Sequence, residues 1–395
     1  MAAPLAGVRV LDVTRMMPGN YCTWLLSSLG ADVIKVEEPV TGDPMRSFGV
    51  QVDGQGATHH LVNRGKRSIA IDLKDEAGRE AFLRLADTAD VVVESFRPGV
   101  MDRLGLGPDV LRARRPSLVV GSISGFGADG PHATLAAHDI NGLAFSGHLD
   151  RLPRGTSGVP SVPTVPIADL VGGSLLPALG LVALVFRARA TGEGGWLGAA
   201  LADGAALLPT VELADYLAGA ALRPGGSAEF GGRPFYRVYE LADGFAAVGA
   251  VEPHFWRALC DALGLDEYAD AQHDEARRAE TAAALAARFR GLTKSALREV
   301  LAGRNTCTTI VNSYADLLGD PHAHARDLVR DVPGLPMRLL APPFRIDRAR
   351  PAETVGAPRH GEHTHEVLAE VGWSGPAPSG GRMTGATTGI GASDA

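Results

Sequence analysis

The chain has 395 residues and a formal net charge of −7, with 21% charged and 45% hydrophobic residues. This length exceeds what one core usually needs, so we expect a larger and a smaller domain. The acidic balance lacks the basic surface of a nucleic-acid-binding protein, and we expect no nucleic-acid partner.

Cysteine spacing and hydropathy predict the compartment. The three cysteines, Cys22, Cys260 and Cys307, are far apart, which argues against a zinc site or a disulfide framework and suits a reducing cytoplasm. No signal peptide is evident at residues 1–13, and the most apolar stretch, residues 170–186, contains three glycines and a proline. We interpret this stretch as a buried helix and expect no membrane partner.

The N-terminal half alternates strands and helices. A β-α-β pattern is formed by a strand at 7–13, a helix at 18–29 and a strand at 31–36, followed by strands at 68–73, 89–93 and 117–123 and a helix at 76–86. Such alternation predicts an α/β domain, Rossmann-like, with a parallel sheet covered on both faces. Residues 15–20, the first turn, lack the G-x-G-x-x-G fingerprint, so a nicotinamide or flavin dinucleotide is not indicated.

The C-terminal half predicts a smaller α+β domain. A turn at 192–195 and a long helix at 201–221 come first, and the Pro-Gly-rich stretch 223–227 then marks a domain boundary. Beyond the boundary, a hairpin pairs residues 236–240 with 245–249. Three helices follow it, at 255–263, 277–289 and 295–302. We expect a large domain at 1–222 and a small domain at 223–330. A proline-rich return segment at 331–374 should pack on the large domain and end in a short helix at 364–372. Residues 375–395 should form a disordered tail.

Three acid–base candidates follow turns or strand ends. His138 comes after the glycine-rich loop 125–131, Asp169 precedes the apolar helix, and Glu252 precedes Pro253. A glycine-rich turn lets the backbone approach a ligand closely. Taken singly, however, each residue is more typical of a helix cap or a satisfied core group than of a catalyst.

Several motifs together resemble the class III CoA-transferase (CaiB/BaiF) superfamily. They include Gly-Ala-Asp-Val-Ile-Lys-Val-Glu at 30–37, Asn-Arg-Gly-Lys-Arg-Ser at 63–68, Phe-Arg-Pro-Gly-Val at 96–100, His-Asp-Ile-Asn at 138–141 and Gly-Ala-Val-Glu-Pro at 249–253. The last two are most similar to the α-methylacyl-CoA racemase branch. The resemblance runs from residue 4 to about residue 374.

This resemblance implies a racemase that acts on 2-methylacyl-CoA-type thioesters by two-base 1,1-proton transfer through an enolate. His138 and Asp169 would flank the α-carbon, and Glu252 would orient His138. The backbone at Asp139 is our candidate donor to the enolate oxygen, an expectation that follows from the helix start rather than from the family. No cofactor is expected, since CoA is part of the substrate.

Further expectations concern binding and assembly. Four basic residues of the matching motifs, Arg64, Lys66, Arg67 and Arg97, are candidates for the CoA phosphates. Phe235 and Tyr236 are candidates for the acyl pocket, although aromatic residues there are as typical of a core. The family's interlocked homodimer is compatible with the proline-rich segment.

The sequence also departs from the racemase pattern. Glu37-Glu38-Pro39 stands where the racemases tend to have arginine before proline, Gly142 where they usually have tyrosine, and residues 194–198 and 306–311 also differ. Two alternatives therefore stay open. One is a class III CoA-transferase that forms an acyl anhydride on Asp169, and the other is a low-turnover acyl-thioester-binding homologue.

Overall fold

The protein is described by a computed structural model that covers residues 3–222, 231–351 and 355–375. Contacts divide the chain into two compact units. The first lies within residues 1–146, 163–208 and 327–395, and the second within residues 147–162 and 209–326. The domain bounds expected from the sequence stay a prediction, and the expected tail from residue 376 onward lies outside the described residues.

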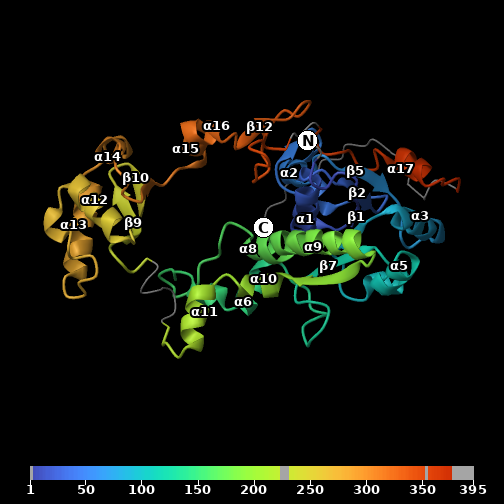
Figure 1. Cartoon of the computed structure of the whole chain (residues 1–395), viewed down its shortest axis with the longest axis horizontal. Coiled ribbons are helices and arrows are strands. Elements are labelled where there is room, and N and C mark those ends of the chain that lie inside the picture. Colours follow the sequence, from blue (N-terminus) through green and yellow to red (C-terminus); the bar gives the residue numbers. More distant parts are fainter. Residues whose placement is uncertain (1–2, 223–230, 352–354, 376–395) are drawn as a thin grey trace, which may run out of the picture. The chain divides into compact units, whose positions relative to one another are not determined.

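The first unit is built on a six-stranded sheet in which all neighbouring strands are parallel, in the order β5-β2-β1-β6-β7-β8. Figure 1 labels four of these strands, β5, β2, β1 and β7. Its strands are β1 (Arg9–Val13), β2 (Asp32–Glu37), β5 (Arg67–Ala70), β6 (Val91–Glu94), β7 (Val119–Ser124) and β8 (Gly195–Ala200). The predicted parallel sheet is confirmed. The strand order reverses direction between β1 and β6, which makes this point the topological switch of the sheet.

Helices cover both faces of the sheet. Val120 belongs to the core formed with α3 (Glu76–Thr88) and α5 (Pro108–Arg114). A Cβ on the neighbouring Gly121 would lie 2.9 Å from Leu181 of α9 (Leu176–Thr191). Because successive strand residues face opposite sides, α9 covers the face opposite α3 and α5.

The first unit contains further short elements. Its other helices are α1 (Met16–Ser28), a 3₁₀ turn (Pro44–Arg46), α2 (Ala57–Asn63), α4 (Val100–Arg103), α6 (Asp139–Phe145), α8 (Ile167–Leu170), a π-helical turn (Val171–Leu175), α10 (Leu201–Ala206) and α17 (Thr364–Glu370). Two small antiparallel pairs are β3 (Gln51–Val52) with β4 (Gln55–Gly56), and β12 (Val329–Asp331) with β13 (Arg338–Leu340).

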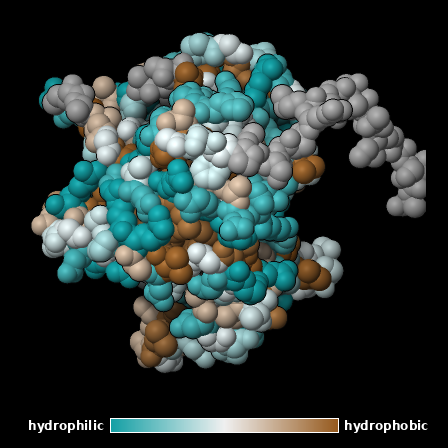
Figure 2. Space-filling model, turned by 90° about the vertical axis from the view of Figure 1, so that its right-hand side faces the viewer, coloured by the Kyte–Doolittle hydropathy of each residue, from teal (hydrophilic) through white to brown (hydrophobic). Residues whose placement is uncertain are grey.

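The apolar stretch from α8 through the π-helical turn to α9 is continuous. By length and composition alone, its 25 residues, Ile167–Thr191, form one helix apolar enough to cross a membrane. Leu181 is buried against the sheet, whereas Leu179 and Phe186 are 67% and 76% exposed. The expectation of a buried helix is therefore correct for one face only, and apolar areas also appear on the surface drawn in Figure 2.

The edge strand β5 is covered by the C-terminal return segment. The amide of Ala70 donates to Thr364 Oγ1 at 3.0 Å, and the amide of His363 donates to the Ser68 carbonyl at 2.8 Å. Arg67 on the same strand pairs with Glu370 of α17. These contacts satisfy backbone groups that an open edge would expose.

The second unit has an antiparallel sheet of order β11-β10-β9 packed on helices. Its elements are α7 (His148–Arg151), α11 (Thr210–Leu217), β9 (Tyr236–Leu241), β10 (Gly244–Gly249), α12 (Pro253–Leu263), a 3₁₀ turn (Asp266–Tyr268), α13 (Arg278–Arg290), α14 (Lys294–Leu301), β11 (Thr308–Ile310), α15 (Tyr314–Gly319) and α16 (Pro321–Ala325). The predicted hairpin and its three following helices are confirmed.

Two elements differ from the expectations. The helix expected at 201–221 is wrong as one element: it is interrupted before Pro209, because proline lacks an amide donor for the helix. Strand β8 was not expected, since Gly-Trp-Leu-Gly-Ala-Ala has weak strand propensity. It forms through six paired positions along β7.

Candidate active site

The loop after β7 approaches the start of α6 so closely that only glycine fits at its first position. A Cβ on Gly125 would lie 2.4 Å from the Cβ of Ala137. Phe126 packs edge-on against Phe145 of α6, with ring centroids 5.6 Å apart. His138 is thereby held at the N-cap of α6, where its amide donates to Asn141 Oδ1 at 3.0 Å and its side chain is exposed.

Asp169 lies on α8, which packs against α6. A Cβ on Gly142 would lie 3.2 Å from the Cβ of Ala168, so the two helices meet closely. The Asp169 amide donates to Asp139 Oδ1 at 3.0 Å. Asp139 directly follows His138, and the structure therefore joins the segments of two predicted catalytic residues within one unit.

The Asp169 carboxyl has an altered acidity. Burial, reinforced by the nearby Asp139 carboxylate, raises the pKa of Asp169 to about 7. Both effects disfavour the charged form of a carboxyl group. A carboxyl group with this pKa exchanges protons readily near neutral pH, which suits general acid–base chemistry.

A π-helical turn follows Asp169 and fixes its backbone. Ser174 Oγ lies 2.8 Å from the carbonyl oxygens of both Asp169 and Pro18. Gly172 of this turn meets Gly204 of α10, where an added Cβ would lie 2.1 Å from the Gly172 Cα. This turn was not predicted from the sequence. Such turns are frequent at functional sites.

A cavity of about 440 Å³ lies at the carboxyl ends of β1, β2, β5 and β6. It is lined by apolar side chains, among them Val13, Val36, Ile71, Phe96 and Leu104, and by the charged residues Arg15, Glu37, Glu38, Asp43, Asp72 and Lys74. Crevices at the switch point of an open parallel sheet commonly bind ligands. Sequence reasoning missed Arg15 and Lys74, although each follows the end of a strand, which is the signal that would have located them.

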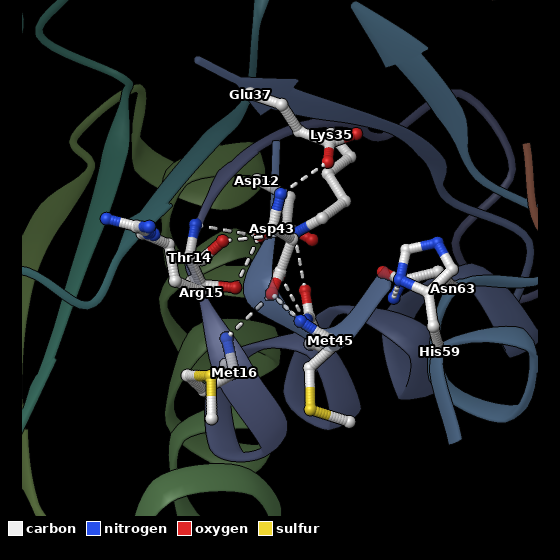
Figure 3. A network of polar contacts seen from close by, with 12 residues as sticks. Asp12, Thr14, Arg15, Met16, Lys35, Glu37, Asp43, Met45, His59 and Asn63 are labelled. Carbon is white, nitrogen blue, oxygen red and sulfur yellow. Dashed lines mark hydrogen bonds and ion pairs between the residues drawn. The ribbon is translucent and has the colours of Figure 1, made fainter. Parts of the chain in front are cut away.

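A buried polar network supports this cavity (Figure 3). Lys35 pairs with Asp43 and Lys66 pairs with Asp12, each at 2.9 Å and almost wholly buried. Asp43 also accepts hydrogen bonds from the amides of Met16 and Met45 at 3.3 and 2.9 Å. The network thus fastens the loops after β1 and β2 to each other.

The basic residues expected to bind phosphate lie in different surroundings. Lys66 is fully buried in this network, and Arg64 is buried with its guanidinium 4.3 Å from the Trp24 ring centroid. Neither lines the cavity, and their role as phosphate ligands stays a prediction. Arg67 pairs with Asp32 at 2.7 Å as well as with Glu370. Arg97 is exposed, next to the cavity residue Phe96.

The remaining candidates lie in the second unit. Glu252 is exposed at the N-cap of α12, and its role beside His138 stays a prediction. Phe235 is 4% exposed and packs against Trp256 in the core, which agrees with the alternative that it is a core residue, and its role in an acyl pocket stays a prediction. Tyr236 is 38% exposed at the start of β9. Within the described ranges, no cluster of three or more His, Cys, Asp or Glu residues is arranged to hold a metal ion.

The chain is similar in sequence to a known family and to proteins with known reactions. The sequence profile of CoA-transferase family III matches residues 5–364. The alpha-methylacyl-CoA racemase of Mus musculus is 35% identical over 374 residues, covering 94% of each chain. The succinyl-CoA:mesaconate CoA-transferase of Haloarcula marismortui is 34% identical over 386 residues, covering 93% of this chain and 96% of its own.

A solved structure agrees with the fold. The crystal structure of a CAIB/BAIF family protein from Brucella suis superposes with a TM-score of 0.81 at 30% identity, covering 94% of this chain and all of that one. The comparisons thus include relatives with two reaction types, matched over almost the same length and with nearly equal identity.

Proposed function

This chain belongs to CoA-transferase family III, and within that family we propose that it is an isomerase. It would invert the configuration of a 2-methylacyl-CoA-type thioester by moving the proton on the carbon next to the thioester carbonyl. The racemase relatives support this choice.

The observation that carries the proposal is the acidity of Asp169 beside the start of α6. A racemase needs a group that accepts a proton in one direction and donates it in the other. A carboxyl group with a pKa raised to about 7 is populated in both protonation states at neutral pH. A nucleophilic carboxylate, by contrast, works best when it is fully ionised.

The proposed reaction has two steps. One of the pair His138 and Asp169 removes the α-proton, and the C–H electron pair moves into the C–C bond as the carbonyl oxygen gains negative charge. The Asp139 backbone N–H, at the first position of α6, would donate to that oxygen. The other member of the pair then delivers a proton to the opposite face, which inverts the carbon.

We further propose the switch-point cavity as the site of the CoA nucleotide. Its apolar walls suit an adenine ring, and Arg15, Lys74 and Arg97 supply cations at or beside it. Arginine and lysine pair with phosphate oxygens. No cofactor besides the CoA carried by the substrate enters this proposal.

A class III CoA-transferase is the second candidate. In that reaction Asp169 would attack the thioester and form an acyl anhydride with release of CoA. The CoA-transferase relatives, at 32–34% identity, favour it.

The assembly we propose is a homodimer in the cytoplasm. Exposed Leu175, Leu179 and Phe186 form an apolar row on α9 and the turn before it. Contiguous exposed apolar surface commonly marks an interface. Equilibrium sedimentation that finds a monomer at all concentrations would contradict the dimer.

The test is proton exchange measured by NMR in deuterated water. The wild-type protein is expected to exchange the α-proton of a 2-methylacyl-CoA without any second acid present, and His138→Ala and Asp169→Ala are expected to lose inversion. If a transferase operates instead, hydroxylamine will attack the activated Asp169 carboxyl and convert it to a hydroxamate with release of the carboxylate or CoA, and exchange will be absent.

A further inference from the structure

Glu38 stands at the mouth of the switch-point cavity and folds back onto its own loop. Its carboxylate accepts hydrogen bonds from the amides of Val40, Thr41 and Gly42, with Val40 at 3.2 Å and Gly42 at 3.0 Å. The Thr41 hydroxyl donates to the same carboxylate at 2.5 Å. Successive backbone amides that converge in this way form a nest that binds anions. In this protein the anion in the nest is the carboxylate of Glu38 itself.

The loop that forms this nest is fastened on both sides. The Glu38 carbonyl lies 2.9 Å from His360 Nε2 of the return segment. On the other side, the Asp43 amide donates to Glu37 Oε2 at 2.9 Å. Gly42 has a φ of +64°, a conformation that glycine adopts without strain. The carboxylate of Glu38 therefore has a fixed receptor next to the cavity.

The charge of Glu38 differs from that of Glu37 and Asp43, two other acids in the cavity wall. Glu37 is paired with Arg46 at 2.6 Å, and Asp43 with Lys35 at 2.9 Å. In the described part of the chain, Glu38 forms no such ion pair, only the hydrogen bonds of its own loop. Burial acts to raise the pKa of Glu38, but the hydrogen bonds from Thr41, Val40 and Gly42 lower it to about 2. The carboxylate is thus ionised at neutral pH and keeps its full charge at the cavity mouth.

We propose that Glu38 is a specificity-determining residue that closes this amide nest to phosphate, so that the site recognises its thioester substrate without the 3′-phosphate of CoA. A phosphate monoester carries up to two negative charges and would meet a fixed carboxylate where amide donors would otherwise receive it. Recognition then rests on the pantetheine arm, the diphosphate and the adenine ring. The proposed substrates are thioesters of pantetheine-type carriers, with or without the 3′-phosphate of CoA. This proposal rests on the proposed function, because it assigns the cavity to the CoA nucleotide.

The test compares CoA with 3′-dephospho-CoA by isothermal titration calorimetry of the full chain at low ionic strength. The variants are Glu38→Gln, which keeps an acceptor oxygen for the loop amides but removes the charge, and Glu193→Gln as the matched control. Glu193 is exposed in the turn before β8, at the opposite end of the sheet strands. Exchange of the α-proton from the 2-methylacyl esters of both carriers is measured in parallel.

We expect the wild-type protein to bind dephospho-CoA at least as tightly as CoA. Glu38→Gln should tighten CoA binding by about tenfold, or ~1.4 kcal/mol, with dephospho-CoA unchanged, and Glu193→Gln should change neither. Added salt should reduce the difference. Wild-type binding of CoA about tenfold tighter than of dephospho-CoA, or an equal effect of Glu38→Gln on both, would overturn the role of Glu38.

Two other outcomes separate this inference from the proposed function. If both carriers bind as expected but neither ester exchanges its α-proton, the isomerase proposal fails and the role of Glu38 is supported. If neither carrier binds, the cavity is not the nucleotide site, and both proposals are overturned.

Discussion

Replacing Lys66 by methionine tests whether the buried polar network holds the switch-point loops. Lys66 Nζ lies 2.9 Å from Asp12 Oδ2 and 2.8 Å from Asn63 Oδ1, and both members of the ion pair are fully buried. Removal of one partner from a buried pair costs about 3–5 kcal/mol, because an uncompensated charge remains. This is a large part of the ~5–15 kcal/mol that stabilises a typical domain. We therefore expect Lys66→Met to lower the free energy of unfolding by that amount at neutral pH.

The pH dependence of this loss follows from Asp12. Burial alone would raise the pKa of Asp12, but Lys66, Lys35 and the hydroxyls of Thr14 and Thr23 lower it. The Asp12 carboxylate therefore contributes stability above its unfolded pKa of about 3.8 and loses it as the pH falls below that value. Burial lowers the pKa of Lys66 from 10.5 to about 8, so the ionised lysine offsets part of this contribution near neutral pH. Without Lys66 the pKa of Asp12 should rise, so the cost of the substitution is greatest at neutral pH and shrinks as acid protonates Asp12.

The assay is urea unfolding followed by circular dichroism at pH 7.5 and pH 3.5, with linear extrapolation. Lys74→Met, at an exposed lysine, is the control for loss of one positive charge. The double variant Asp12→Asn with Lys66→Met removes both charges and should be more stable than the sum of the two single losses implies. The reasoning is refuted if Lys66→Met unfolds within about 1 kcal/mol of the wild type, or if its cost is the same at both pH values.

Three other expectations concern single positions. Gly125→Ala should cost about 1–3 kcal/mol in urea unfolding and slow α-proton exchange, because the new Cβ would lie 2.4 Å from the Cβ of Ala137; unchanged stability and rate would contradict the close approach. Burial raises the pKa of Glu94 from 4.5 to about 6, so its ionisation opposes folding as the pH rises through this range. Glu94→Gln should therefore raise the free energy of unfolding by up to ~2 kcal/mol at pH 8 and by little at pH 4, and an equal gain at both pH values would oppose this explanation. Asp139→Asn should lower the pKa of Asp169 and move the acidic limb of the kcat/KM profile to lower pH, whereas a limb that stays in place would show that Asp139 does not act on Asp169 electrostatically.

The core of the fold was predictable because its signals are local. The strands β1, β2 and β6 are runs of apolar and β-branched residues, and α3 separates two of the sheet strands with a helical pattern. Strand β8 carried no such signal, because its small residues become a strand only when β7 offers a partner edge. The break before Pro209 was readable from the proline itself, whereas the π-helical turn after Asp169 arises from packing against α10.

The candidate site residues were named from the sequence, and their role stays a prediction, whereas their surroundings could not be predicted. His138 and Asp169 were found from motifs, yet the Asp139 hydrogen bond that joins their segments spans 30 positions of the chain. Lys66 illustrates the limit. A lysine in a basic motif suggests a phosphate ligand, and only its pairing with Asp12, 54 positions away, shows that it belongs to the interior.

The most direct measurement of the proposed mechanism follows each enantiomer of a 2-methylacyl-CoA separately in deuterated water. If two bases act on opposite faces, His138→Ala should still wash the α-proton out of one enantiomer, and Asp169→Asn should do so only for the other. Neither variant should invert its substrate. Unchanged inversion in either variant, or loss of exchange for both enantiomers in both folded variants, would contradict the two-base mechanism.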